Sequence, residues 1–591
     1  GDGKKDSPYI ITKAEELAWF RNQVNSGQYS ICAKIADNVE VIDMSTVCHA
    51  ADKSQNLEEK SWVPIGNRNI IKYRGTFDGN GKTITNLYIN ASQTSQNNMG
   101  LFGYTYQSTI KNLTFENANV TNTQSNTGIL VGKAGYGSTL QNIKISKTCQ
   151  IKGGNYTGGI AGELDGNAYN CVNYATVQGI QYIGGLCGHY SSSRTGNSMT
   201  ACANYGNVTA TSQRVGGLVG DFSSGTIQDC ANYGNVKGAN SVAGMAGFVD
   251  KGKIQNVFSY GSISATNGTE VGMVLGYSKY GATEGMVAYY SGAKLTANSQ
   301  EITVKAFGSG NLSEDNATGF TETQLKSGVV AYQLQQNASN GAKWGQNLAD
   351  SRDQYPVPGS DNKVIKAAQG DKDANGNDTY WATFSNLKND VTLSVPSDRT
   401  LKVYNATVSG GKMTLTERNS QVAKDEGVLL KTDGEYVNAK ANETNELTKA
   451  SSDENHLVAT PAEAQTVTAE TGCKLYRLTY KNATNKERLG FYLSVDKANN
   501  SSNGTSLKAT PGKAYLKVSE NEAKDPSSAA LARSFVFGGG NETTGIEGIT
   551  IMGTDVQRHG TIEGIFDLQG RKISNPTKGI YIKNNKKVVI K

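Results

Sequence analysis

A glycine-rich box recurs along the first half of the chain and constrains the fold more than any other feature. Each copy ends in a glycine, and successive closing glycines are separated by 29, 30, 26, 32, 27 and 29 residues. Such self-similarity is typical of a stacked array, in which no single repeat can bury its own apolar face. The copies are Met99–Gly103, Gly128–Gly132, Gly158–Gly162, Gly184–Gly188, Gly216–Gly220, Ala243–Gly247 and Gly272–Gly276.

A second phrase follows each box and ends in an apolar residue. Three repeats replace this Leu, Ile or Val by Cys171, Cys202 and Cys230. Because a buried thiol behaves as a small hydrophobe, we expect a column of free cysteines and no disulfides there. Asparagines two residues later, at Asn173, Asn204 and Asn232, predict a ladder of stacked side chains. A bridge between Cys32 and Cys48 stays open.

These patterns predict a mainly β chain that begins with a parallel β-solenoid. Helical spacing after Thr12 predicts an N-terminal helical cap, and residues 323–337 show a second helical pattern. Ten short apolar segments between residues 381 and 537, bounded by turn residues, favour an antiparallel β-sandwich. The expected divisions are a cap and first coils (1–60), the solenoid (61–320), its C-terminal cap and linker (321–367), the sandwich (368–537), a linker (538–548) and a small C-terminal β module (549–591).

The boxes resemble the GLUG motif, named for Gly-Leu-hydrophobic-Gly, over roughly residues 60–300. The resemblance implies an exported, adhesin-like bacterial protein. The segments Ile565–Ile573, Lys578–Lys583 and Lys586–Lys591 resemble the C-terminal sorting module of exported Bacteroidetes proteins. That likeness implies a secreted or outer-membrane location, with a leader that the sequence in hand does not include.

Charge and hydropathy exclude two classes of partner. The net charge is only +6, with 58 basic and 52 acidic residues interspersed, which argues against a nucleic-acid partner. No run of 18 apolar residues exists, so we expect no transmembrane segment.

The residue after each box supplies the sharpest candidate site. If the register holds, Glu163, His189 and Asp221 lie on adjacent coils about 5 Å apart per step. Such a column predicts either general acid–base chemistry on a polysaccharide or a solvated row of paired charges. The second interpretation is the expected one, because neither an obvious Arg nor a carboxylate cluster suited to Ca²⁺ flanks the column. No HExxH, GxSxG or P-loop motif occurs in the chain either.

Two weaker patterns concern ligands. The loop tyrosines Tyr136, Tyr156, Tyr182 and Tyr190 are candidate sugar-stacking platforms. The segment Asp371, Asp373, Asn375 and Gly376 matches the opening of a calcium loop, although position 12 is Ala382 and an interdomain turn is the favoured interpretation. We expect no other cofactor.

We therefore expect a non-catalytic surface or secreted protein that uses its repetitive solenoid to bind an extracellular glycan or a host or bacterial surface protein. The alternatives are a polysaccharide lyase or glycosidase built on Glu163, His189 and Asp221, and a purely structural stalk.

Overall fold

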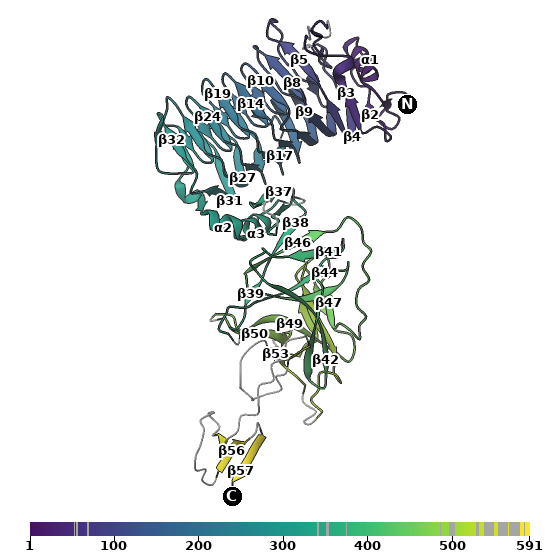
Figure 1. Cartoon of the computed structure of the whole chain (residues 1–591), viewed down its shortest axis with the longest axis vertical. Coiled ribbons are helices and arrows are strands. Elements are labelled where there is room, and N and C mark those ends of the chain that lie inside the picture. The colour runs from purple at the N-terminus through teal and green to yellow at the C-terminus, as the bar shows by residue number, and fades with distance from the viewer. Residues whose placement is uncertain are drawn as a thin grey trace. The chain divides into compact units, whose positions relative to one another are not determined.

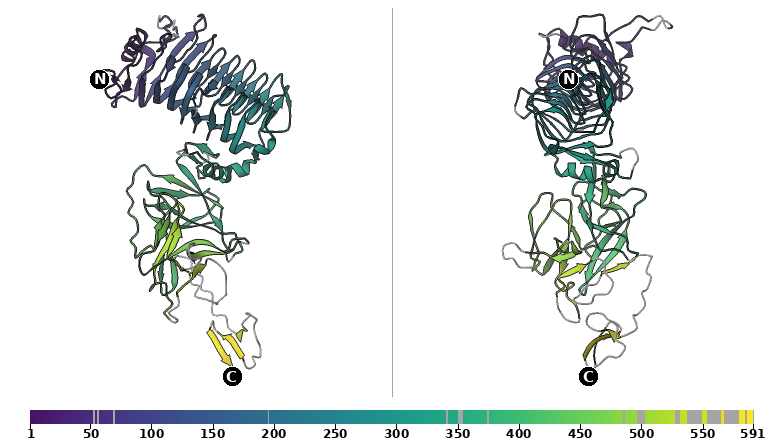
Figure 2. Two further views of the ribbon diagram at one scale, coloured as in Figure 1. Left: turned by 180° about the vertical axis from the view of Figure 1, so that it is seen from behind. Right: turned by 90° about the vertical axis from the view of Figure 1, so that its left-hand side faces the viewer.

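The computed structural model confirms a mainly β chain and a parallel β-solenoid of about eight turns (Figure 1). In the right-hand view of Figure 2 the coils overlap, so that the solenoid is seen nearly end-on. The structure describes residues 1–51, 54, 57–67, 70–194, 196–339, 342–349, 354–373, 375–484, 486–495, 503–526, 531–536, 549–552, 565–566, 579–583 and 586–590.

In the largest solenoid sheet, one set of strands begins at the last two residues of each box. Strands at this position pair in parallel with their equivalents one period away, for example Leu164 with Tyr190. These strands are β6 (Phe102–Tyr106), β9 (Val131–Ile145), β12 (Ala161–Tyr169), β16 (Cys187–Ser191), β21 (Val219–Phe222), β26 (Ala246–Val249), β30 (Leu275–Ser278) and β34 (Phe307–Gly310).

Further along each coil the chain re-enters the same sheet. The strands there are β4 (Thr76–Thr85), β7 (Thr109–Glu116), β17 (Ser198–Thr200), β22 (Thr226–Gln228), β27 (Lys253–Ser259), β31 (Ala282–Tyr290) and β35 (Thr318–Phe320). Short strands then carry the asparagines: β13 (Val172–Asn173), β18 (Ala203–Asn204) and β23 (Ala231–Asn232). The first coils contribute β1 (Tyr9–Ile11), β2 (Ala33–Ile35) and β3 (Val41–Asp43).

Two further sheets complete the coils. One contains β5 (Tyr88–Ala91), β8 (Asn119–Asn122), β10 (Gln150–Lys152), β14 (Thr176–Gly179), β19 (Val208–Ala210), β24 (Val236–Gly238), β28 (Ile263–Ala265), β32 (Leu295–Ala297) and β33 (Gln300–Glu301). The other contains β11 (Thr157–Gly158), β15 (Ile183–Gly184), β20 (Val215–Gly216), β25 (Val242–Ala243) and β29 (Val271–Gly272).

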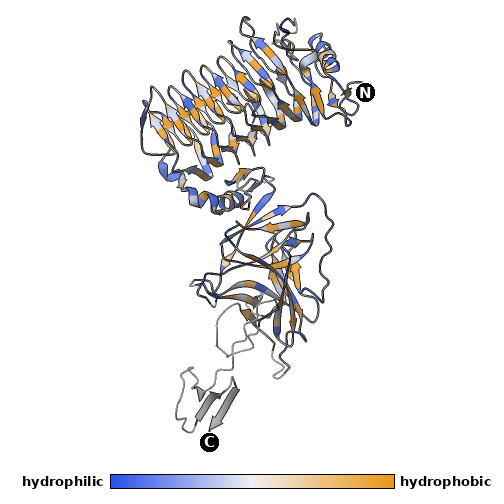
Figure 3. Cartoon of the chain, in the orientation of Figure 1, coloured by the Kyte–Doolittle hydropathy of each residue, from blue (hydrophilic) through white to orange (hydrophobic). Residues whose placement is uncertain are grey.

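One apolar core runs through the array, and the box residues Leu186 and Leu218 both belong to it. Figure 3 shows the corresponding hydrophobic bands repeating from coil to coil. The predicted cysteine column is confirmed: Cys171, Cys202 and Cys230 are fully buried and free. The thiol of each later cysteine accepts the backbone N–H of the cysteine before it at 3.4 Å.

The box glycines make room for an asparagine ladder, which confirms the stacking expected from sequence. Asn173 donates to Asn204 at 2.8 Å, and Asn204 donates to Asn232 at 2.9 Å. A Cβ at Gly185 would lie 2.3 Å from Cγ of Asn204, and one at Gly217 would lie 2.2 Å from Cγ of Asn232. The glycine box and the asparagine phrase are therefore parts of one packing unit.

Cys32 and Cys48 are not bridged, so the disulfide left open by the sequence is absent. Both thiols are buried and free. Each accepts a backbone N–H at 3.3 Å, from Thr76 and Tyr88 respectively. Because the two donors, Thr76 and Tyr88, lie twelve residues apart on the next coil, the cysteines occupy different corners of the solenoid.

The helix α1 (Ala14–Asn25) packs at the start of the array. Its buried Phe20 meets Tyr73 and Phe77, with ring centroids 5.9 and 6.1 Å apart. The sequence suggested Thr12 as the residue that caps this helix, and that expectation is wrong: the N-cap residue is Lys13, and Thr12 donates its hydroxyl to Glu16 at 2.9 Å.

The segment expected to cap the far end lies instead along the side of the coils. We call the described residues between 321 and 358 the strap; they contain α2 (Glu322–Lys326), α3 (Val329–Gln336), β36 (Trp344–Gly345) and β37 (Val357–Pro358). Apolar strap residues pack on Ala231, Phe258 and Ala288 of three successive coils. A single helix was expected over 323–337, but Gly328 adopts φ +90° and separates α2 from α3.

A buried carboxylate pins the strap to the solenoid. Asp229 accepts the indole N–H of Trp344 at 3.0 Å, the backbone N–H of Ser339 at 3.1 Å and a hydrogen bond from Asn256. At the last coil β33 turns back antiparallel to β32, and Glu314 accepts the backbone N–H groups of Ala306 and Phe307 at 2.7 and 2.8 Å. These contacts satisfy backbone N–H groups that would otherwise donate hydrogen bonds to a further coil.

The chain forms two compact units. The first comprises residues 1–401, 420–426 and 430–449, and the second comprises residues 402–419, 427–429 and 450–591. Beyond the solenoid, the first unit contains a four-stranded antiparallel sheet of β38 (Asn362–Lys366), β46 (Tyr436–Ala441), β41 (Val391–Ser394) and β44 (Gln421–Val422). It also contains the pair β39 (Ala368–Gln369) and β40 (Tyr380–Ser385).

The second unit contains the hairpin of β42 (Leu401–Ser409) and β43 (Lys412–Arg418), with β54 (Ile549–Met552) parallel to β43. A five-stranded sheet is built from β47 (Leu457–Ala459), β52 (Ala514–Ser519), β49 (Cys473–Asn482), β50 (Glu487–Leu493) and β53 (Ser534–Val536), beside the pair β48 (Thr466–Thr468) and β51 (Ser506–Lys508). The strand β45 (Gly427–Thr432) contributes to both units. Strands occur at all ten positions expected from sequence, and their arrangement as a sandwich stays a prediction.

The C-terminal segments form a three-stranded antiparallel sheet of β55 (Ile565–Phe566), β56 (Gly579–Lys583) and β57 (Lys586–Ile590). The expected linker over residues 538–548 lies outside the described residues, as does the whole segment between β55 and β56. Within the described part of the chain, the helices are too short and too polar to cross a membrane.

Candidate functional site

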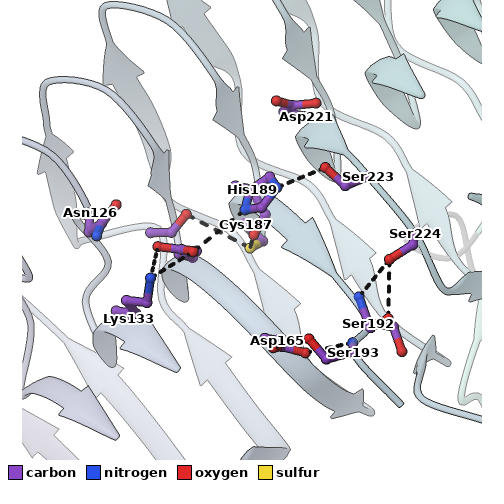
Figure 4. A network of polar contacts seen from close by, with 12 residues as sticks. Asn126, Lys133, Asp165, Cys187, His189, Ser192, Ser193, Asp221, Ser223 and Ser224 are labelled. Atoms are coloured by element: carbon purple, nitrogen blue, oxygen red, sulfur yellow. Dashed lines mark hydrogen bonds and ion pairs between the residues drawn. The ribbon is translucent and has the colours of Figure 1, made fainter. Parts of the chain in front are cut away.

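The outward column expected from the boxes is present on the largest solenoid sheet. Parallel register places Glu163 beside Lys133 on one side and His189 on the other, and His189 beside Asp221. Because side chains alternate across a strand, these residues point outward while Leu164 and its equivalents point into the core. Figure 4 shows Lys133, His189 and Asp221 on strands of this sheet, and the register places the strand of Glu163 between those of Lys133 and His189.

Glu163 lies between two cationic or potentially cationic neighbours. Its carboxylate is 2.8 Å from Nζ of Lys133 and 3.8 Å from Nδ1 of His189. Burial opposes ionisation of Glu163, but hydrogen bonds from His189 and Lys133 outweigh it and hold the pKa of this carboxyl below its ordinary value. Nε2 of His189 lies 2.9 Å from the hydroxyl of Ser223. Glu163 is thus an ionised partner in a charge row.

Asp221 is paired with a residue that sequence reasoning missed. One of its oxygens accepts from Arg214 at 3.0 Å, and only 12% of its side chain is exposed. The guanidinium lies 3.9 Å from the ring centroid of Phe248 and 5.3 Å from that of Tyr182. Arg214 occupies the position two residues before a box, and this spacing could have identified it.

Two tyrosines at that same position form a ladder. The rings of Tyr156 and Tyr182 are nearly parallel, with centroids 4.7 Å apart and an angle of 9°. Both residues are half-buried and adopt left-handed backbone, with φ of 53° and 59°. Since each ring covers a face of the other, the ladder presents ring edges and hydroxyls more than open faces to a ligand.

Two tyrosines expected as sugar platforms behave differently from one another. Tyr190 is fully buried, stacks on Phe222 at 5.3 Å and donates to the carbonyl of Gly166, so it cannot contact a ligand. Its expected role is wrong, because it is the neighbour of the outward His189 and therefore points inward. Tyr136 remains at the surface, where the guanidinium of Arg194 lies 4.6 Å from its ring centroid.

The calcium-like segment forms a turn that uses one of its own carboxylates. Asp373 accepts the backbone N–H groups of Asn375 and Asn377 at 2.9 and 2.8 Å. Lys372 pairs with Asp378 at 3.3 Å. No group of three or more His, Cys, Asp or Glu residues arranged to hold a metal occurs in the described part of the chain.

The geometry of the outward column suits ionic and hydrogen-bonding contacts with a ligand. A glycosidase needs two carboxyl groups on either side of one bond and an acid whose pKa is raised. The backbones of Glu163 and Asp221 are two strand spacings apart, about 10 Å. The pKa of Glu163 is lowered, which is the opposite of what a general acid requires.

Comparison with known proteins gives distant likenesses. No family model matches the chain. A stretch of 229 residues is 31% identical to halomucin of Haloquadratum walsbyi, and a stretch of 103 residues is 31% identical to a protein of Evansella cellulosilytica described as a candidate Gly-rich membrane protein. These matches cover 38% and 17% of this chain but only 2% and 10% of the relatives, so the chain spans a small part of either protein.

Among solved structures, the chain is similar to a candidate immunoglobulin A1 protease from Bacteroides ovatus. The identity is 20% and the TM-score 0.40, over 60% of this chain and 94% of the other.

Proposed function

We propose that the chain is a GLUG-type, adhesin-like protein of the bacterial surface or exterior, in which the solenoid binds an extracellular glycan or protein. The observation that carries the proposal is the outward column. It presents a different polar or aromatic side chain at each coil, from Lys133 to Tyr277, above a continuous apolar core. A rigid scaffold with variable surface residues is suited to recognition.

Several observations support an extracellular setting. One relative carries the description of a membrane protein. The likeness to halomucin over 229 residues falls within a much larger protein, as the 2% coverage indicates. The three-stranded C-terminal sheet is compatible with the Bacteroidetes-type sorting module. A β-sandwich between the solenoid and this module would act as a spacer or second binding module.

The test is a glycan and surface-protein array probed with the full chain and with the triple variant Glu163→Ala, His189→Ala and Asp221→Ala. Binding that survives the triple substitution supports recognition outside the trio. Absence of binding to every glycan and protein would contradict the proposal and favour a stalk.

One observation favours a second candidate, a polysaccharide lyase or glycosidase: Glu163 and His189 approach to 3.8 Å on adjacent coils. Release of reducing ends or unsaturated products from acidic and neutral polysaccharides, abolished by Glu163→Gln, would establish that activity and replace the binding proposal.

A further inference from the structure

We infer that the N-terminal part of the same outward face binds an acidic polysaccharide. The inference rests on the proposed function and names its ligand class. The site, which we call the basic patch, consists of three tyrosines and three cations: Tyr104, Tyr106, Tyr136, Lys72, Arg74 and Arg194.

Parallel register builds the patch. Tyr73 pairs with Thr105 of the next coil, so Lys72 and Arg74 lie beside Tyr104 and Tyr106. Tyr73 and Thr105 are fully buried. Because side chains alternate along a strand, their neighbours on both sides point outward. Lys72 therefore extends the column of Glu163 and His189 by two coils beyond Lys133.

The cations lie on the tyrosine rings. Nζ of Lys72 is 4.6 Å from the ring centroid of Tyr104 and 5.2 Å from that of Tyr106. The guanidinium of Arg74 is 5.3 Å from the centroid of Tyr106. Such contacts restrict a flexible cation before a ligand arrives.

The third cation reaches the patch from a loop two coils further on. Arg194 lies 4.6 Å from the ring centroid of Tyr136, and Tyr136 stacks on Tyr106 with centroids 5.9 Å apart. Gly135 leaves space for Tyr104, since a Cβ there would lie 2.8 Å from Cε2 of that ring. Three coils and one loop thus converge on one surface.

The charge of the patch is not balanced by carboxylates. Lys72, Arg74 and Arg194 have no ion-pair partner within the ranges that the structure describes. Carboxylates on neighbouring coils are otherwise engaged: Glu163 binds Lys133, and Asp165 accepts from the backbone and hydroxyl of Ser193 at 2.9 and 2.6 Å. In a chain whose charges are otherwise interspersed, this local excess favours an anionic partner.

The arrangement of the cations favours carboxylate or sulfate groups on a sugar chain. A guanidinium that lies over a ring keeps in-plane N–H donors for a forked bond to such an anion, although Arg194 also shares a side-chain hydrogen bond with Tyr136. Arg74 and Arg194 are both exposed. The tyrosine faces carry cations or one another, so they are poorly available for stacking nucleotide bases, whereas phenol groups can exchange hydrogen bonds with sugar hydroxyls.

The experiment measures binding of the full chain to immobilised hyaluronan, which carries carboxylates, and dextran sulfate, which carries sulfates, with neutral dextran as the blank, at about 0.15 M salt. The test variant is Arg74→Ala with Arg194→Ala. The matched control is Lys152→Ala with Lys237→Ala, which removes the same charge from exposed, unpaired positions on another solenoid sheet. Thermal unfolding checks that both variants fold.

We expect the chain to bind at least one acidic polymer and the patch variant to lose about ten-fold or more in affinity, with less than about two-fold loss in the control. Binding to hyaluronan alone identifies carboxylate as the recognised group, and binding to dextran sulfate alone identifies sulfate. Equal losses in both variants, or competition by duplex DNA as strong as by the free polysaccharide, would overturn the inference. Binding of the wild-type chain to neutral glycans or proteins only would also overturn it while leaving the proposed function intact.

Discussion

The inner and outer faces of three successive coils can be compared position by position. One inward position repeats the same chemistry and holds Cys171, Cys202 and Cys230, all fully buried. One outward position on the same coils changes at every step and holds Glu163, His189 and Asp221. Stacked coils bury each inward residue against its equivalents, so a change there disturbs its neighbours above and below. Outward residues face solvent on one side, which leaves that column free to differ from coil to coil and to acquire recognition.

The contrast between the inner and outer faces fails if an inward side chain can be truncated without loss of stability. We expect Leu218→Ala to lower the free energy of unfolding by about 2–5 kcal/mol, because Leu218 is fully buried in the shared core. Urea unfolding followed by circular dichroism measures the change. The conservative Leu218→Met serves as the control, and a loss below about 1 kcal/mol in Leu218→Ala would contradict continuous packing.

The link between box and ladder is tested by Gly185→Ala. The new methyl group would lie 2.2 Å from the backbone oxygen of Gly217 and 2.3 Å from Cγ of Asn204, and we expect a loss of about 1–3 kcal/mol from overpacking, of which removal of the Asn204 side chain relieves only the second contact. The double variant with Asn204→Ala should recover part of this loss in the same unfolding assay. No recovery would show that the glycine is needed for another reason.

The outward ion pair of Arg214 and Asp221 should show an intermediate effect on stability. Arg214→Ala leaves the carboxylate of Asp221, whose side chain is only 12% exposed, without its partner, and we expect a loss of about 1–2 kcal/mol. Arg214→Ala combined with Asp221→Ala should cost less than the two single changes together, as a double-mutant cycle in thermal unfolding would measure. Strict additivity would exclude an energetic pairing.

The smallest effect is expected at Glu163, and it should depend on pH. Because the pKa of Glu163 is lowered in the fold, its ion pairs stabilise the protein above the unfolded carboxyl pKa, near 4.5, and this contribution is lost as pH falls through the folded value. Glu163→Gln should therefore cost about 1 kcal/mol or less at pH 7 and nothing at strongly acidic pH. Melting temperatures of both proteins across pH 3 to 7 test this, and a difference that persists in acid would point to packing rather than charge.

Most of the solenoid could be predicted from the repeat, because every coil packs in the same way. The cysteine column, the asparagine ladder and the Glu163–His189–Asp221 register all follow from the period and from alternation along a strand. Alternation also explains the error at Tyr190, whose neighbour His189 was already assigned outward. Features that occur once could not be predicted: the strap on Asp229, the reach of Arg194 back to Tyr136 and the pairing of Lys72 with Tyr104 depend on non-repeating segments.

The strap changes how the solenoid would resist a pull on the chain beyond residue 358. Such a force reaches the Trp344–Asp229 bond and the apolar contacts across three coils before it reaches the last strand. Contacts spread over several coils share the load in parallel, whereas the edge strand alone would peel one hydrogen bond at a time. A repeat array held at its flank is thereby protected from unzipping at its end.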